Sequence, residues 1–106
     1  MTHHHFHLDK LSRFTAHLED LFTDLRLYQE DAPPELADEI AVTAGEIMLL
    51  LAAHSDDELV RETLDVARRL REAARTVQPR RTQLVEAGVA LTNDVARIIR
   101  EEKRAA

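Results

Sequence analysis

Apolar residues recur in alternating steps of three and four through residues 8–30, which is the spacing of one face of an α-helix. This stripe consists of Leu11, Phe14, Leu18, Leu21, Leu25 and Tyr28. The sequence Asp-Ala-Pro-Pro follows at residues 31–34. Proline cannot continue a helix but is tolerated in the first turn of the next one. The pattern therefore predicts a helix from about Leu8 to the turn at Asp31.

A second helix is predicted from about Pro34 to Ala53. Its inner face carries Leu36, Ile40, Ile47 and Leu50, widened by Ala37, Ala41, Ala44, Met48 and Leu51. Because apolar residues cover so much of its circumference, we expect this helix to be the most buried. Ser55 and Glu58 then have the spacing of a capping box, in which each side chain satisfies a free backbone N–H. A third helix should begin there.

The third helix is predicted to end near Gln78, and a fourth to follow it and to fray from Glu101. Their apolar positions are Leu59, Val60, Leu64, Ala67, Leu70, Ala74 and Val77, then Leu84, Val85, Leu91, Val95, Ile98 and Ile99. Pro79 separates them, and a proline inside a helix costs about 3 kcal/mol. The apolar stripe nevertheless continues across this position, so one long helix kinked at Pro79 is the alternative.

These elements predict an all-α fold, an antiparallel up-down-up-down four-helix bundle in one domain that spans residues 1–106. Two glycines and three prolines are too few for the turns of a sheet protein, and 106 residues suit a single core. In the alternative fold, a helical hairpin and one long helix kinked at Pro79 assemble with other copies into an oligomeric bundle.

The composition of the chain excludes several kinds of site and a membrane-spanning segment. The chain has no cysteine, which excludes disulfides, thiolate nucleophiles and sulfur-rich zinc sites. Its longest apolar run, residues 47–53, is far shorter than the roughly 20 residues that span a bilayer. We therefore expect a cytoplasmic protein without a membrane span.

The start of the chain is rich in histidine. His3, His4, His5 and His7 are spaced closely enough for neutral imidazoles to bind a divalent metal. No neighbouring carboxylate or cysteine completes such a site. The simpler interpretation is a frayed, solvated terminus or a tag-like sequence.

A second candidate metal site lies inside the predicted bundle. Folding the first two helices about residue 31 brings His17 level with Glu46, and Asp94 lies at a similar height on the fourth helix. Asp20 is one turn from His17 on the same helix. Such a cluster has the ligands for a divalent metal or for acid–base catalysis. The competing interpretation is that these residues are ordinary charges at the rim of the apolar stripes.

The one basic run ends in Arg75, Arg80 and Arg81, a candidate anion-binding group. In an up-down-up-down bundle the first and third turns share an end, so the acids of residues 30–35 should lie opposite these arginines and offset their charge. Nucleic acid is an unlikely partner, because the net charge is −6 and the few aromatic residues all lie in the first helix.

Surplus apolar surface points to interaction with other chains. Four apolar residues fall outside the main stripes: Phe22, Leu27, Val66 and Val89. Gly45 and Gly88 lie inside helices, where glycine costs about 1 kcal/mol relative to alanine, so we expect helices to approach closely there. A small cavity or ligand niche at these glycines is the alternative.

From the sequence we therefore expect a non-enzymatic helical interaction protein, such as an adaptor, regulator or chaperone-like module. The expected partner is a second copy or another helical protein, and no cofactor is needed. The alternative is a divalent-metal-binding bundle or a small metal-dependent enzyme.

Overall fold

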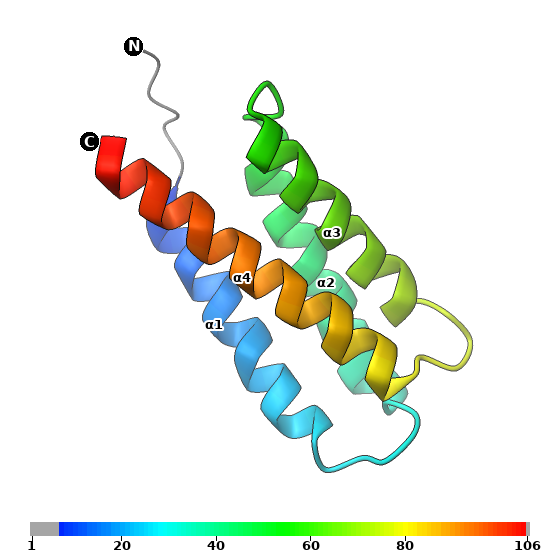
Figure 1. The fold of residues 1–106 in the computed structure, drawn as a ribbon. Helices are drawn as coiled ribbons and strands as arrows, with labels where there is room; N and C mark the ends of the chain where they lie inside the picture. The colour runs from blue at the N-terminus through cyan, green and yellow to red at the C-terminus, as the bar shows by residue number, and fades with distance from the viewer. Residues whose placement is uncertain (1–6, 106) are drawn as a thin grey trace.

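The computed structural model describes residues 7–105 and contains four α-helices in that range (Figure 1). They are α1 (Leu8–Leu25), α2 (Pro34–Ala52), α3 (Glu58–Ala74) and α4 (Arg81–Ala105). Each helix packs on two neighbours, so that α1 and α3 both lie between α2 and α4. Successive helices run in opposite directions (Figure 1). The fold is the predicted up-down-up-down four-helix bundle, 47 × 20 × 17 Å in extent.

The break at Pro79 is real, and the alternative of one long kinked helix is wrong. Between α3 and α4 the chain leaves the helical conformation, and its backbone bonds to the loop between α1 and α2. The Ala32 amide donates to the Pro79 carbonyl at 2.8 Å, and the Arg81 amide donates to the Glu30 carbonyl at 2.7 Å. The first and third turns therefore share an end of the bundle, as the topology predicts.

This pairing of loops explains why two helices end earlier than predicted. The last turn of α1 gives way after Leu25 to bonds that reach back three residues, such as the Leu27 amide to the Asp24 carbonyl. Tyr28, assigned to the buried stripe, is 41% exposed. Val77 likewise lies beyond the end of α3 and is fully exposed. Residues 26–33 and residues 75–80 form the two loops that cross this end of the bundle.

The start of α3 also differs from the prediction. The side chain of Asp57, rather than Ser55, caps the helix, because its Oδ1 accepts a hydrogen bond from the Val60 amide at 3.2 Å. Ser55 stays in the loop, where its carbonyl accepts a bond from the Arg61 side chain. The capping box was wrong because the turn after α2 takes two more residues than that motif allows.

The core is made from one apolar stripe per helix. Its fully buried large side chains are Leu11, Leu18, Leu25, Ile40, Ile47, Leu51, Leu70, Leu84, Leu91, Val60 and Val95. As predicted, α2 contributes the largest number of buried residues among the described parts of the helices. No helix within residues 7–105 is both long and apolar enough to cross a membrane.

Three threonines lie in this core without disrupting it. The hydroxyls of Thr15, Thr43 and Thr63 each donate to the backbone carbonyl four residues earlier, at 2.7–2.8 Å. A buried hydroxyl is costly only when it lacks a partner. These residues therefore behave as core positions, although their polarity alone suggests the surface.

The cap of α3 gives a direct test of the helix start. Asp57→Ala should lower the free energy of unfolding by about 1 kcal/mol, because it removes the acceptor for the Val60 amide. Ser55→Ala is the matched control and should change stability little. Urea denaturation followed by circular dichroism measures both. A larger loss for the Ser55 variant would contradict this assignment of the cap.

Candidate functional site

The outer face of α2 carries a second apolar stripe, besides the one that enters the core. Val42, Gly45, Leu49 and Ala52 follow one another in steps of three, four and three, so they share a face. Val42 is 62% exposed and Leu49 is 72% exposed. The inner stripe, by contrast, includes the fully buried Ile40 and Ile47. A helix that is apolar on opposite sides has one side left for another chain.

An open groove of about 870 Å³ runs beside this stripe, between α2 and α3. Small residues of α2 form much of its floor, and Met48 and Leu64 add larger apolar surfaces. The small residues are Ala41, Gly45 and Ala52. Because these side chains are small, they would not hold another helix away from α2 along this groove. The groove therefore has the shape and chemistry to receive a helix.

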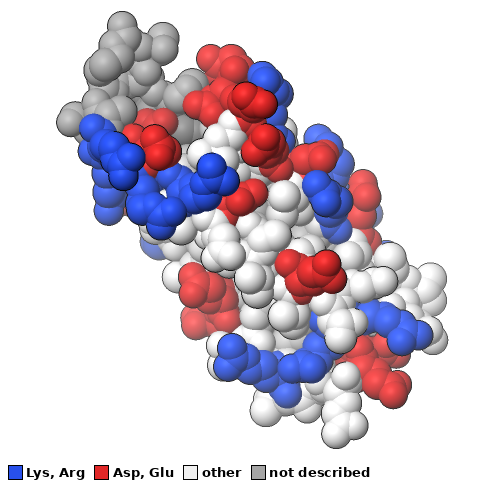
Figure 2. Space-filling model, in the orientation of Figure 1, with Lys and Arg blue, Asp and Glu red and all other residues white. Residues whose placement is uncertain are grey.

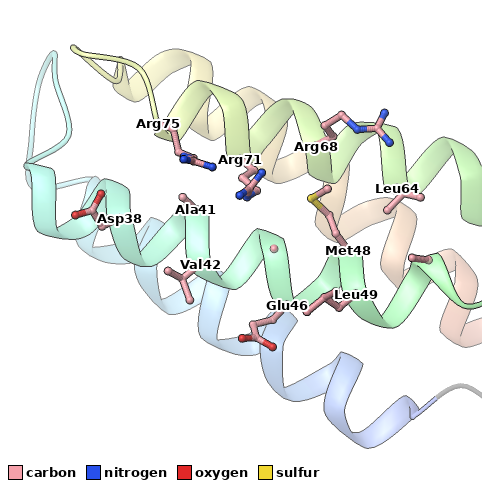
Figure 3. A pocket seen from close by; sticks show the side chains of 12 residues that line it. Asp38, Ala41, Val42, Glu46, Met48, Leu49, Leu64, Arg68, Arg71 and Arg75 are labelled. Atoms are coloured by element: carbon pink, nitrogen blue, oxygen red, sulfur yellow. The ribbon is translucent and has the colours of Figure 1, made fainter.

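The two edges of the groove carry opposite charges. Arg68, Arg71 and Arg75 line the α3 edge, whereas Asp38 and Glu46 line the α2 edge. Figure 3 shows Arg71 and Arg75 reaching from α3 toward α2.

Most of these charges have no ion-pair partner within the described chain. Arg68 pairs with Asp65 of its own helix at 2.7 Å. Within residues 7–105, Arg71, Arg75, Asp38 and Glu46 make no ion pair. Both edges of the groove thus keep charges that are available to another molecule.

The two glycines inside helices have different surroundings. At Gly88 an added Cβ would overlap the ring of Phe22, which fills the space beside the glycine. At Gly45 a Cβ would meet only the Arg71 side chain, at an ordinary 3.7 Å. The neighbour of Gly88 is thus a side chain of α1 and not, as was predicted, the backbone of a closely approaching helix. For Gly45 no contact in the described structure requires glycine.

A smaller groove of about 420 Å³ lies on the other side of the α2 stripe, between α1 and α2. It contains both His17 and Glu46, two residues of the predicted inner metal site. His17, however, interacts with a different acid: its Nε2 lies 3.3 Å from Oε2 of Glu39. Both side chains are largely exposed, so this contact is a surface pair between α1 and α2.

The other predicted metal ligands are dispersed. Asp20 is exposed on α1 and Asp94 is half-buried on α4, and neither lines the groove that holds His17. His7 is exposed just before α1, while His3, His4 and His5 lie outside the described residues. Within residues 7–105, no group of three or more histidines and carboxylates is placed to hold a metal ion.

The three predicted anion-binding arginines divide between two places. Arg75 lines the α2–α3 groove, whereas Arg80 and Arg81 lie at the start of α4, beside the paired loops. The acids of residues 30–35 share this end of the bundle, but no ion pair joins them to the three arginines in the described chain. On the face that carries α4, acidic and basic side chains are interspersed (Figure 2).

Sequence reasoning missed the residues that make this surface, Val42, Leu49 and Asp38. Of the four off-stripe residues that it named, Leu27 and Val89 are indeed exposed, whereas Phe22 and Val66 pack against the core. The signal that marks α2 is its second stripe, with the same three-four spacing as the buried one.

Comparisons with known proteins found no matching family model, no matching curated protein and no matching solved structure.

The contrast between the glycines is testable. Gly88→Ala should destabilise the protein, because overpacking costs about 1–3 kcal/mol and outweighs the gain in helix propensity of about 1 kcal/mol. Gly45→Ala should instead stabilise the fold by up to about 1 kcal/mol, since its Cβ meets no tight contact. Chemical denaturation at low protein concentration measures both.

The Phe22→Ala background supplies the control. With the ring removed, Gly88→Ala should become stabilising, because only its helix propensity remains. If Gly88→Ala stays destabilising there, Phe22 is not the reason for the glycine.

Proposed function

We propose that this chain is a non-enzymatic interaction protein that associates with a second copy of itself through the outer face of α2. The observation that carries the proposal is the exposed apolar stripe of Val42 and Leu49 beside the α2–α3 groove. Contiguous apolar surface of this kind is typical of sites where proteins bind one another. An adaptor, regulator or chaperone-like role follows from such a surface.

The energetics support association through these side chains. Complete burial of a valine or leucine contributes about 1.5–3 kcal/mol. In a symmetric dimer both Val42 and Leu49 are buried twice, once in each copy. Most of this gain is available, because each side chain is more than half exposed in the single chain. The stripe therefore supplies a substantial part of the free energy that a stable dimer needs.

The alternative functions from the sequence have less support. A metal-dependent role needs several ligands on one ion, and the described residues offer no such group. An anion-binding role needs converging arginines, and no pocket of the described chain is lined by Arg75 together with Arg80 or Arg81. Neither the apolar stripe nor the small-residue floor has a part in those roles.

The proposal predicts how the mass of the protein in solution responds to substitution. Light scattering after size-exclusion chromatography should give a multiple of the 12.1 kDa chain mass at micromolar concentrations. Val42→Gln combined with Leu49→Gln should weaken association by at least about a hundredfold, because four apolar side chains per dimer are lost from the interface. Glutamine is a good helix former, so the fold should remain.

Val89→Gln is the matched control, since Val89 is 52% exposed on α4, away from the groove. This variant should keep the mass of the unmodified protein. A mass of 12.1 kDa for the unmodified protein at every concentration would show that the proposal is wrong.

A further inference from the structure

We infer that the groove between α2 and α3 receives α2 of the second copy, in a dimer whose twofold axis runs parallel to the helices. This inference rests on the proposed function and specifies the arrangement of the two copies. It follows from three features of the groove: its opposite charged edges, its small-residue floor and the relative heights of its residues.

The charges distinguish between the two symmetric arrangements of such a face. A face-to-face dimer has its twofold axis in the plane of the interface. If this axis ran across the helices, α3 would lie on the partner's α3, and the arginines of the two copies would face one another. If it runs along the helices, the acidic α2 edge of each copy faces the basic α3 edge of the other. Only the second arrangement is electrostatically complementary.

The positions of the charged residues along the bundle axis, here called heights, fit the arrangement in which the twofold axis runs along the helices. A rotation about an axis along the helices leaves every residue at its own height. Within one chain Gly45 lies beside the Arg71 side chain, so Glu46, one residue further, is close to the level of Arg71. Asp38 and Arg75 line the same end of the groove. Glu46 should therefore lie opposite the partner's Arg71. Asp38 lies on the side of α2 that carries Ala41 and Gly45, and it lines a second pocket with Arg75 of its own chain, so it has no part in this pair.

The side of α2 on which Glu46 lies agrees with this geometry. Glu46 and Leu49 line both the α2–α3 groove and the smaller groove toward α1. When α2 of one copy enters the partner's groove, the partner's α3 comes to lie on the α1 side of α2. The carboxylate of Glu46 and the unpaired arginines of the partner are then neighbours.

The floor of the groove explains Gly45. In this arrangement the two α2 helices run parallel, and each places its small residues Ala41, Gly45 and Ala52 against the same residues of the other copy. Small side chains at these positions let two helix backbones approach closely. Glycine at position 45, which no contact within the described chain requires, then has a role in the contact between copies.

A second copy also fits the groove better than an unrelated acidic or basic helix. An acidic helix would complement Arg71 and Arg75 but would repel Asp38 and Glu46, and a basic helix would do the reverse. The same chain carries both signs in the required order. The groove is therefore complementary to itself.

The test reverses each edge separately. One variant is Glu46→Arg, and the other is Arg71→Glu. Each variant alone should dimerise at least about tenfold more weakly than the unmodified protein in low salt, because two attractive pairs become repulsive. An equimolar mixture should form a heterodimer of nearly the original affinity, since every edge then faces its opposite sign. Sedimentation velocity with one variant fluorescently labelled measures all three.

Matched controls change the charge by the same amount elsewhere. Glu19→Arg on α1 and Arg97→Glu on α4 alter exposed residues outside the groove. These variants should dimerise like the unmodified protein.

The outcomes separate the two claims. If the unmodified protein dimerises but both groove variants do so equally well alone, the arrangement along the helices is wrong, while self-association stands. If the unmodified protein is monomeric at every concentration, both the arrangement and the proposed function are wrong.

Discussion

Two backbone hydrogen bonds between distant loops determine how the helices of this protein are aligned. The loop after α1 and the loop before α4 are joined through Ala32 to Pro79 and through Arg81 to Glu30. Since α2 begins just after the first loop and α3 ends just before the second, these bonds set the height of one helix against the other. They place Asp38 and Arg75 at the same end of the α2–α3 groove. The charge pattern of the groove thus depends on a contact at the end of the bundle.

Helix α2 carries apolar residues on two sides, one in the core and one exposed to solvent, and the proposed function accounts for the exposed side. This helix supplies the largest part of the core among the described residues, yet it also presents Val42 and Leu49 to solvent. A solvated helix face is ordinarily polar, because exposed apolar surface contributes nothing to folding and favours association. The second stripe, with small residues beside it and charges on both sides, has the composition of an interface with an apolar centre and a polar rim.

Much of the fold could be predicted from spacing alone. The three-four stripes identify every helix, and Pro33–Pro34 and Pro79 mark two of the three breaks, because proline acts locally and in a known way. The ends of α1 and α3 were placed too late, since Tyr28 and Val77 continue the spacing although the paired loops have already drawn the chain away. That pairing joins residues almost fifty positions apart, so no local pattern reports it.

The candidate site was harder to predict, for a similar reason. His17 was matched to Glu46 by height, but its partner within hydrogen-bonding distance is Glu39, seven residues earlier on the same side of α2. The prediction was therefore wrong by about two helical turns in height. Spacing gives the face of a helix on which a residue lies more reliably than its height against a neighbouring helix. A second contact was also missed. The ring of Phe22, on α1, fills the space beside Gly88, and the spacing of apolar residues does not predict which side chain of another helix lies there.

In the proposed dimer, the small-residue side of α2 faces the same side of α2 in the second copy. Because the natural chain has no cysteine, one introduced cysteine reports this contact without interference. Ala52→Cys should form a disulfide-linked dimer rapidly under mild oxidation, since a disulfide needs its two Cα atoms within about 7 Å. Val89→Cys, on α4, should remain unlinked under the same conditions. Equal or faster cross-linking at position 89 would contradict the account.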